Sequence, residues 1–180
     1  MSPPNIYKIP EELMKEAIDY AMASKEYTSN RHDFHEGGLD AKKRKMLEGK
    51  MGEKIFKLFL IENKISFKED QTDFTLPDTY DFILPSGLLI DVKTRTKDYH
   101  IRTLEMKEQF ENKPKDVYVS VRLFPEEEQG FIAGWATKED ISKINRIENH
   151  EYLDNYVLYD KELRSIDELI KLINNSPCMF

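Results

Sequence analysis

The strongest constraint on the fold is the stretch YDFILPSGLLIDVKTRT, from Tyr80 to Thr96, in which two apolar runs flank the turn formers Pro85-Ser86-Gly87. Runs rich in aliphatic and aromatic residues on either side of a short turn predict a β-hairpin. Asp81, Asp91 and Lys93 place charges within these apolar runs. Burying a charge is costly unless the charge is paired or binds a ligand. The charges therefore need a partner.

The turn sets the register of this hairpin. Counting outward from the three turn residues places Phe82 opposite Ile90 and therefore Asp81 opposite Asp91. Directly opposed residues have Cβ atoms about 4.5–5.5 Å apart, where like charges are destabilising. Because side chains alternate along a strand, Lys93 shares a face with both aspartates, and the apolar residues take the other face. Two carboxylates together suit a cation such as Mg²⁺, which typically uses one or two carboxylates, waters and substrate phosphate.

Other interpretations of Asp91 remain open. An acidic residue two positions before a lysine is not specific by itself, because this pattern starts at six positions in the chain. The hairpin could lie at a sheet edge with its Asp91–Lys93 face simply solvated. Asp91 could also be structural, paired with Lys93 or with an arginine.

A helix is expected just before the hairpin. Residues 46–63, MLEGKMGEKIFKLFLIEN, have apolar positions at helical spacing, and Glu53 lies at the border of the apolar arc. Gly49 and Gly52 each weaken a helix by roughly 1 kcal/mol relative to alanine, so close packing or the approach of a ligand is a reason for them. The alternative is an exposed Glu53 that pairs with Lys57 at i,i+4.

The rest of the chain predicts helices around a central sheet. Helices are expected at 11–24, about 41–63, about 101–112, 137–145 and 165–173, and strands at 65–70, 80–84, 88–94, 116–124, 130–136 and 156–160. This pattern predicts an α/β or α+β fold. A length of 180 residues suits one domain with a proper core. Trp135 is expected in that core.

Charge permits an anionic partner without demanding one. The net charge is −7, and residues 126–168, with twelve acidic and five basic residues, account for all of it. Residues 41–57, by contrast, hold seven Lys/Arg and two Glu. Such a basic run is either a nucleic-acid contact or a solvated helix face.

Composition also narrows the setting of the protein. The single cysteine, Cys178, excludes an intrachain disulfide framework and a cysteine-based zinc site. No apolar run approaches the roughly 20 residues of a transmembrane helix, and the first residues do not read as a secretory signal. We therefore expect a soluble, cytoplasmic protein without a membrane partner.

In this order and spacing, GKMGEKIFKLFL, YDFIL and IDVK resemble the PD-(D/E)XK nuclease superfamily, the restriction-endonuclease-like fold. The resemblance covers roughly residues 41–137 and implies an αβββαβ core, a mixed central sheet flanked by helices. It leaves out an N-terminal helix and loop, 1–40, and an acidic C-terminal extension, 138–180. Residues 1–180 are expected to form a single nuclease-like domain.

The resemblance implies a metal-dependent active site. By position its residues are Glu53, Asp81, Asp91 and Lys93. The Pro-Asp pair of the family is absent at Asp81, which follows a tyrosine, so Asp78, in a literal Pro-Asp pair, is the reserve.

The implied reaction is hydrolysis of phosphodiester bonds, in DNA in the first place. Asp81, Asp91 and the Val92 carbonyl would hold Mg²⁺ or Mn²⁺, with Glu53 as a ligand directly or through water. Lys93 would position the nucleophile or neutralise charge in the transition state. The basic residues expected to contact the nucleic-acid backbone are Lys42, Lys43, Arg44, Arg95, Lys97 and Arg102.

Two other classes of function stay open. One is a catalytically inactive nuclease-fold module for nucleic-acid binding or assembly. The other is a non-nuclease metal-binding domain whose acidic C-terminal third docks a basic protein. Cutting both strands often calls for a dimer, so a homodimer is one expected assembly. His32 and His35 have a spacing that a metal could use, although surface loops commonly carry such clusters.

Overall fold

The computed structural model of the chain describes residues 4–28, 39–70, 80–97, 99–150 and 152–176. The helices are α1 (Glu11–Thr28), α2 (Leu39–Glu62), α3 (Lys107–Asn112), α4 (Lys138–Ile144) and α5 (Ile166–Asn175), with short 3₁₀ turns η1 (Pro125–Glu127) and η2 (Asp160–Glu162). The strands are β1 (Tyr7–Lys8), β2 (Lys68–Glu69), β3 (Phe82–Ile83), β4 (Leu89–Arg95), β5 (Arg102–Met106), β6 (Val117–Phe124), β7 (Gln129–Thr137), β8 (Ile147–His150) and β9 (Leu153–Tyr159).

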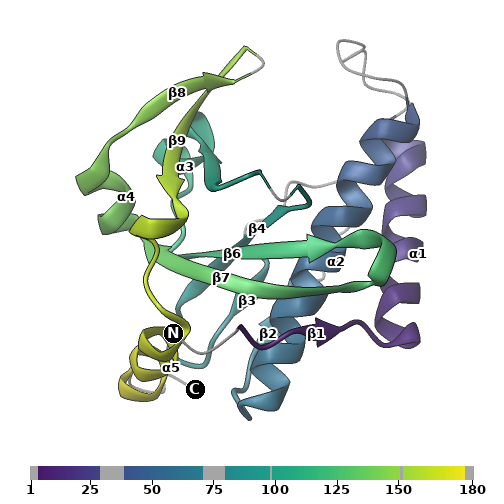
Figure 1. Ribbon diagram of the computed structural model, residues 1–180, viewed down its shortest axis with the longest axis horizontal. Coiled ribbons are helices and arrows are strands. Elements are labelled where there is room, and N and C mark those ends of the chain that lie inside the picture. Colours follow the sequence, from purple (N-terminus) through teal and green to yellow (C-terminus); the bar gives the residue numbers. More distant parts are fainter. Residues whose placement is uncertain (1–3, 29–38, 71–79, 98, 151, 177–180) are drawn as a thin grey trace.

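The strands form two sheets. The larger sheet has the order β1-β7-β6-β4-β3-β2, and the smaller one β5-β9-β8. In the larger sheet β4 runs parallel to β6 and the other neighbours are antiparallel, so the sheet is mixed. Figure 1 shows α1 and α2 side by side along the larger sheet, with the smaller sheet and α4 beyond its other side. The α+β class, a curled mixed sheet flanked by helices, is therefore confirmed.

The hairpin has the predicted register. Phe82 pairs with Ile90, and the turn ends at Gly87, whose φ of 82° is a left-handed conformation that glycine adopts at little cost. The apolar side chains of this hairpin face α2 and fill the main core. From the helix come Met51, Ile55, Phe56, Phe59 and Leu60, and from the hairpin Phe82, Leu84 and Ile90.

A close contact between α2 and β4 explains one of the two helix glycines. A Cβ atom added at Gly52 would lie 1.9 Å from the Thr94 Oγ1 atom, closer than any side chain could tolerate. A Cβ atom added at Gly49 would meet nothing within 4 Å. Gly52 is therefore required by close packing, whereas Gly49 leaves open space beside the strand.

The predicted helix at 101–112 is wrong in its first half. Residues Arg102–Met106 form β5, and α3 begins only at Lys107. Thr103 and Glu105 are buried while their neighbours are less so, which is the alternation of a strand. Leu, Glu and Met favour a helix locally, but pairing with β9 satisfies the backbone of this segment instead. In the smaller sheet, β9 confirms the strand predicted at 156–160, whereas β5 and β8 were not predicted as strands.

Several other predictions are confirmed. The helix expected at 137–145 is α4, which Thr137 caps in a capping box with Asp140. Trp135 is buried in the main core, and its indole N–H donates to the Ser165 carbonyl at 2.8 Å. None of the helices in the described part of the chain combines the length and the apolar character that crossing a bilayer requires.

Candidate active site

Asp81 directly precedes β3, next to the Phe82–Ile90 pair of the hairpin. Its backbone N–H donates to the Ile90 carbonyl at 2.9 Å, and its Oδ2 accepts from the Val92 N–H at 2.6 Å. Burial, together with the nearby carboxylates of Glu53 and Asp91, raises the pKa of Asp81 well above its ordinary value. Three carboxylates, one from α2 and two from the hairpin, therefore influence one another at this point.

Glu53 reaches this region from α2. Its side chain is buried, and both of its carboxylate oxygens lie 2.9 Å from the Lys50 Nζ atom, one turn earlier. The alternative of an exposed Glu53 paired with Lys57 is wrong, because Lys57 instead contacts Glu69 at 2.7 Å. The border position that the helical pattern gave to Glu53 places it against the hairpin.

Lys93 is held between two carboxylates. Its Nζ atom lies 2.9 Å from Asp91 Oδ2 and 2.5 Å from Glu105 Oε2. Burial lowers the pKa of Lys93, but these two carboxylates outweigh it and raise the pKa above its ordinary value. The interpretation of a solvated Asp91–Lys93 face is wrong, since Asp91 and Lys93 are each only about a fifth exposed and Glu105 is buried. The pairing expected of a structural Asp91 is present.

Glu105 is the site residue that sequence reasoning missed. It lies on β5, in the smaller sheet, with a side chain only 5% exposed. Burial raises its pKa, and the Lys93 ammonium offsets only part of that rise. The only signal in the sequence was the acidic residue in RTLEM. Because this segment was predicted as a helix, the sequence did not indicate that the Glu105 side chain faces Lys93.

The carboxylate oxygens of this site are the kind of ligand that Mg²⁺ or Mn²⁺ prefers, but they are not arranged around one point as metal ligands. Asp91 Oδ2 is buried and accepts no hydrogen bond from the described residues, although Lys93 Nζ is nearby. Among the same residues, no three His, Cys, Asp or Glu side chains are grouped to hold a metal ion. Mg²⁺ typically needs only one or two carboxylates beside waters and phosphate. Asp81 and Asp91 therefore fit it chemically.

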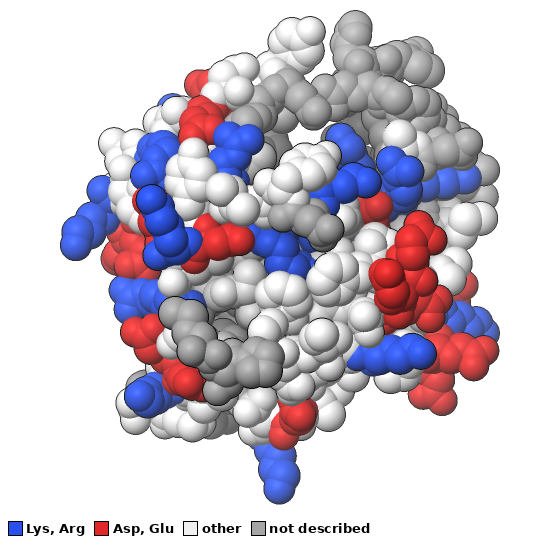
Figure 2. Space-filling model, viewed as in Figure 1, with Lys and Arg blue, Asp and Glu red and all other residues white. Residues whose placement is uncertain are grey.

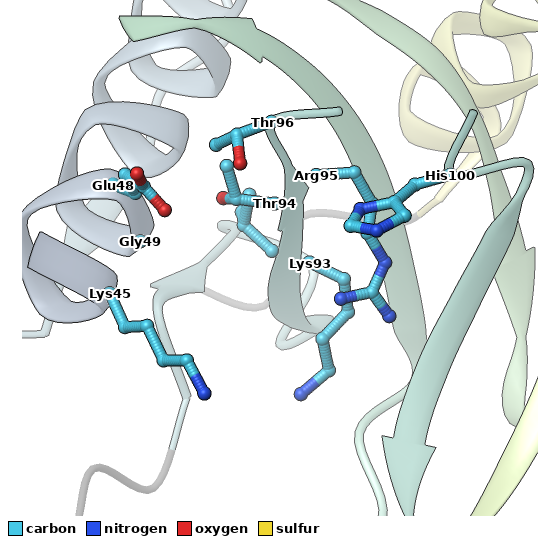
Figure 3. Close-up of a pocket in the computed structure, with 9 residues that line it drawn as sticks. Lys45, Glu48, Gly49, Lys93, Thr94, Arg95, Thr96 and His100 are labelled. Carbon is cyan, nitrogen blue, oxygen red and sulfur yellow. The ribbon is translucent and has the colours of Figure 1, made fainter. Parts of the chain in front are cut away.

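A pocket of about 380 Å³ lies next to Lys93, between α2 and β4. Figure 3 shows that Lys45 from the helix and Lys93 and Arg95 from the strand extend in the same direction, with the His100 ring beside Arg95. Glu48 lies on the helix side of the pocket, on the same helix as Lys45. Gly49 also lines the pocket, where its missing side chain leaves room. The cation excess of this pocket suits a phosphate group.

The predicted backbone-contact residues fall into two groups. Residues 42–44 lie on α2, where Arg44 is 75% exposed with its Nε atom 3.7 Å from Glu48. Arg95, Lys97 and Arg102 lie at the end of β4 and the start of β5. The side chain of Lys42 and the residues Asp78, His32 and His35 are outside the described parts of the chain.

Charge is spread unevenly over the face in Figure 2. Acidic side chains gather on the right of the view, where η1 carries Glu126 and Glu127 between β6 and β7. Basic side chains border the hollow at the top, near the upper end of α2. On this face the acidic cluster on the right lies apart from the basic side chains near the hollow, whereas acidic and basic side chains are interspersed on the left.

Comparisons of the chain with models of protein families, with curated proteins and with solved structures found no match. The geometry of the site therefore carries the functional argument.

Proposed function

We propose that the protein is a metal-dependent nuclease that hydrolyses phosphodiester bonds, in DNA in the first place. The observation that carries the proposal is the convergence of carboxylates on the hairpin. Asp91 from β4 and Glu53 from α2 both lie close enough to Asp81 to raise its pKa. A fold that keeps like charges together at a cost in stability gains from a bound cation.

The order of elements supports a restriction-endonuclease-like αβββαβ core. Helix α2 is followed by the antiparallel strands β2, β3 and β4, then by α3 and by β6, which lies parallel to β4. Strand β5 is inserted before α3 and pairs outside this sheet. The core proposed here therefore ends near the end of β7, and α4, β8, β9 and α5 are additions to it.

The chemistry follows from the roles that the residues can take. Asp81, Asp91 and the Val92 carbonyl would hold Mg²⁺ or Mn²⁺, with Glu53 as a ligand directly or through water. The metal would lower the pKa of a bound water and stabilise charge on the phosphate. Lys93, which Asp91 and Glu105 hold in place, would present its ammonium to a phosphate oxygen or to the attacking water.

The test is a cleavage panel on supercoiled, linear, branched and single-stranded DNA, with Mg²⁺ or Mn²⁺. We expect cleavage that requires metal and disappears in Asp91→Asn, because the site loses an anionic ligand. The matched control is Asp19→Asn, which removes an exposed carboxylate from α1 and should leave cleavage unchanged. Retained cleavage in pure Asp91→Asn protein would defeat the assignment.

One observation favours a second candidate, a nuclease-fold module that binds nucleic acid without cutting it. Lys93 is already ion-paired with two carboxylates, and the described residues form no ready metal cluster. Binding to DNA with no metal-dependent cleavage of any substrate in the panel would select this candidate. A homodimer would be tested by the mass of the protein in solution with and without DNA.

A further inference from the structure

A second pocket borders the first one at the end of β4. Its volume is about 230 Å³, and Arg95 and Thr96 line both pockets. The side chains that matter for its chemistry are two arginines, a lysine, an aspartate and two phenylalanines, namely Arg95, Arg122, Lys97, Asp160, Phe124 and Phe131. A polar, cationic part and an aromatic part thus meet in one small hollow.

Arg95 has donors that the described chain does not satisfy. Its Nε atom donates to the Arg102 carbonyl at 2.8 Å, but its Nη2 atom is buried and has no hydrogen-bond partner among the described residues. Burial, followed by repulsion from Arg122 and Arg102, lowers the pKa of Arg95 to about 10. Burying a guanidinium donor without a hydrogen-bond partner costs free energy, so this arrangement favours the binding of a ligand that supplies an acceptor.

The acids near Arg95 are committed elsewhere. Asp160 is ion-paired with Arg122, and Glu148 with Arg102 at 2.5 Å. Within the described ranges, Arg95 itself makes no ion pair. Among the described residues, two carboxylates therefore accompany three guanidinium groups, and Arg95 is the one whose ion pair is not among them. A phosphate group would supply both the charge and the acceptors, because guanidinium donors match its geometry.

Another part of the lining of this pocket is aromatic. The rings of Phe124 and Phe131 are partly buried, with centroids 6.1 Å apart and planes tilted by 39°. An inorganic anion cannot stack on aromatic rings, whereas a nucleobase can. Because the bases of a duplex face inward, only the sugar-phosphate backbone of a duplex can contact this pocket. A single strand can offer a base as well.

We propose that this pocket binds one nucleotide of a single-stranded segment, with its phosphate at Arg95 and Arg122 and its base against Phe124 and Phe131. The assignment of that nucleotide to the substrate strand rests on the proposed nuclease function, because the pocket adjoins the Lys93 pocket. The substrate class that follows is nucleic acid with a single-stranded stretch beside the cleaved bond.

The experiment measures binding without metal, so that it does not depend on cleavage. A labelled short single-stranded DNA is titrated with the protein in chelator, and a blunt duplex of the same sequence is titrated in parallel. We expect the single strand to bind more tightly. Arg95→Gln should weaken single-strand binding by about tenfold, and Phe131→Leu, which keeps an apolar side chain but loses the ring, by roughly fivefold or more.

The controls separate ligand binding from folding and from bulk charge. Lys143→Gln removes an exposed cation from α4 and should leave binding unchanged. Melting temperature without ligand is measured for each variant. Because Arg95 is repelled by two arginines, Arg95→Gln should melt no lower than the unaltered protein. A clear fall in its melting temperature would assign Arg95 a structural role and overturn the proposal.

The remaining outcomes also decide the matter. Equal binding of single strand and duplex, or unchanged binding in Arg95→Gln, overturns the nucleotide pocket even if the protein cleaves DNA. If deoxyadenosine monophosphate binds as tightly as the single strand, the ligand of the pocket is a free nucleotide. The assignment of the bound nucleotide to the substrate strand is then overturned. The protein could also bind the single strand, lose this binding in Arg95→Gln, and cleave no substrate. That result would support the nucleotide pocket and refute the nuclease proposal.

Discussion

Replacing Asp81 by Asn tests the electrostatic argument most directly. The Asn side chain keeps an oxygen that can accept from the Val92 N–H, which now donates to Asp81 Oδ2 at 2.6 Å. It removes the charge that the Glu53 and Asp91 carboxylates repel. If the carboxylates form a metal site at a cost in stability, Asp81→Asn should have two effects. It should raise the stability of the protein measured without metal, and it should abolish cleavage measured with metal.

The size of the gain follows from the hairpin geometry. Two unit charges about 5 Å apart interact by about 3 kcal/mol at an effective dielectric constant of about 20. Lys50 beside Glu53 and Lys93 beside Asp91 cancel much of this repulsion. Opposed pairs on strands typically contribute about 0.2–1 kcal/mol. We therefore expect a gain of about 1 kcal/mol, or about 2–4 °C in melting temperature for a chain of this length.

The assay is thermal unfolding of the metal-free protein across pH. The raised pKa means that the folded protein carries the penalty only while Asp81 is charged. The advantage of Asn should be full above that raised pKa, shrink as the pH falls through it, and vanish below about 3.9, the ordinary pKa of aspartate.

A control of opposite sign is available at Asp140. Its carboxylate accepts from the Thr137 N–H and pairs with Arg164, and hydrogen bonding from Arg164 is the first cause that lowers its pKa. Asp140→Asn should lower stability by about 0.5–1 kcal/mol at neutral pH. If Asp81→Asn also lowers the melting temperature, or if it retains cleavage, the reasoning about the carboxylates is refuted.

Three further predictions concern packing, pH and binding. Gly52→Ala should cost about 1–3 kcal/mol by forcing α2 away from β4, whereas Gly49→Ala should gain up to about 1 kcal/mol; equal melting temperatures would contradict the packing. Hydrogen bonds from Arg146 lower the pKa of Glu162 to about 2, so Glu162→Gln should cost roughly 0.5–1 kcal/mol at neutral pH. This cost should shrink as acid titrates Glu162 from about 4.3 downward and be absent below about 2; a constant cost would exclude the ion pair. Reversing the charges at residues 42–44 should weaken DNA binding across sequences and flatten its salt dependence; an unchanged slope identifies a solvated helix face.

The hairpin was predictable because its information is local. The length of the turn and the alternation of apolar residues fix which residues oppose each other, and Phe82 does pair with Ile90. The capping box at Thr137 and the burial of Trp135 follow in the same way from a few neighbouring residues. Each of these features depends on chain segments shorter than about twenty residues.

By itself, therefore, the sequence determined the hairpin with its Phe82–Ile90 pairing, the helix beside it, and the α+β class. Only the tertiary structure decided that Glu105 reaches Lys93, because β5 pairs with β9, about fifty residues later, and local preference favours a helix there. It also decided that Arg95 lies close enough to Arg122 and Arg102 for their charges to lower its pKa. Such effects depend on distances in space between segments far apart in the chain, and hydrophobic periodicity carries no record of which distant strands will pair.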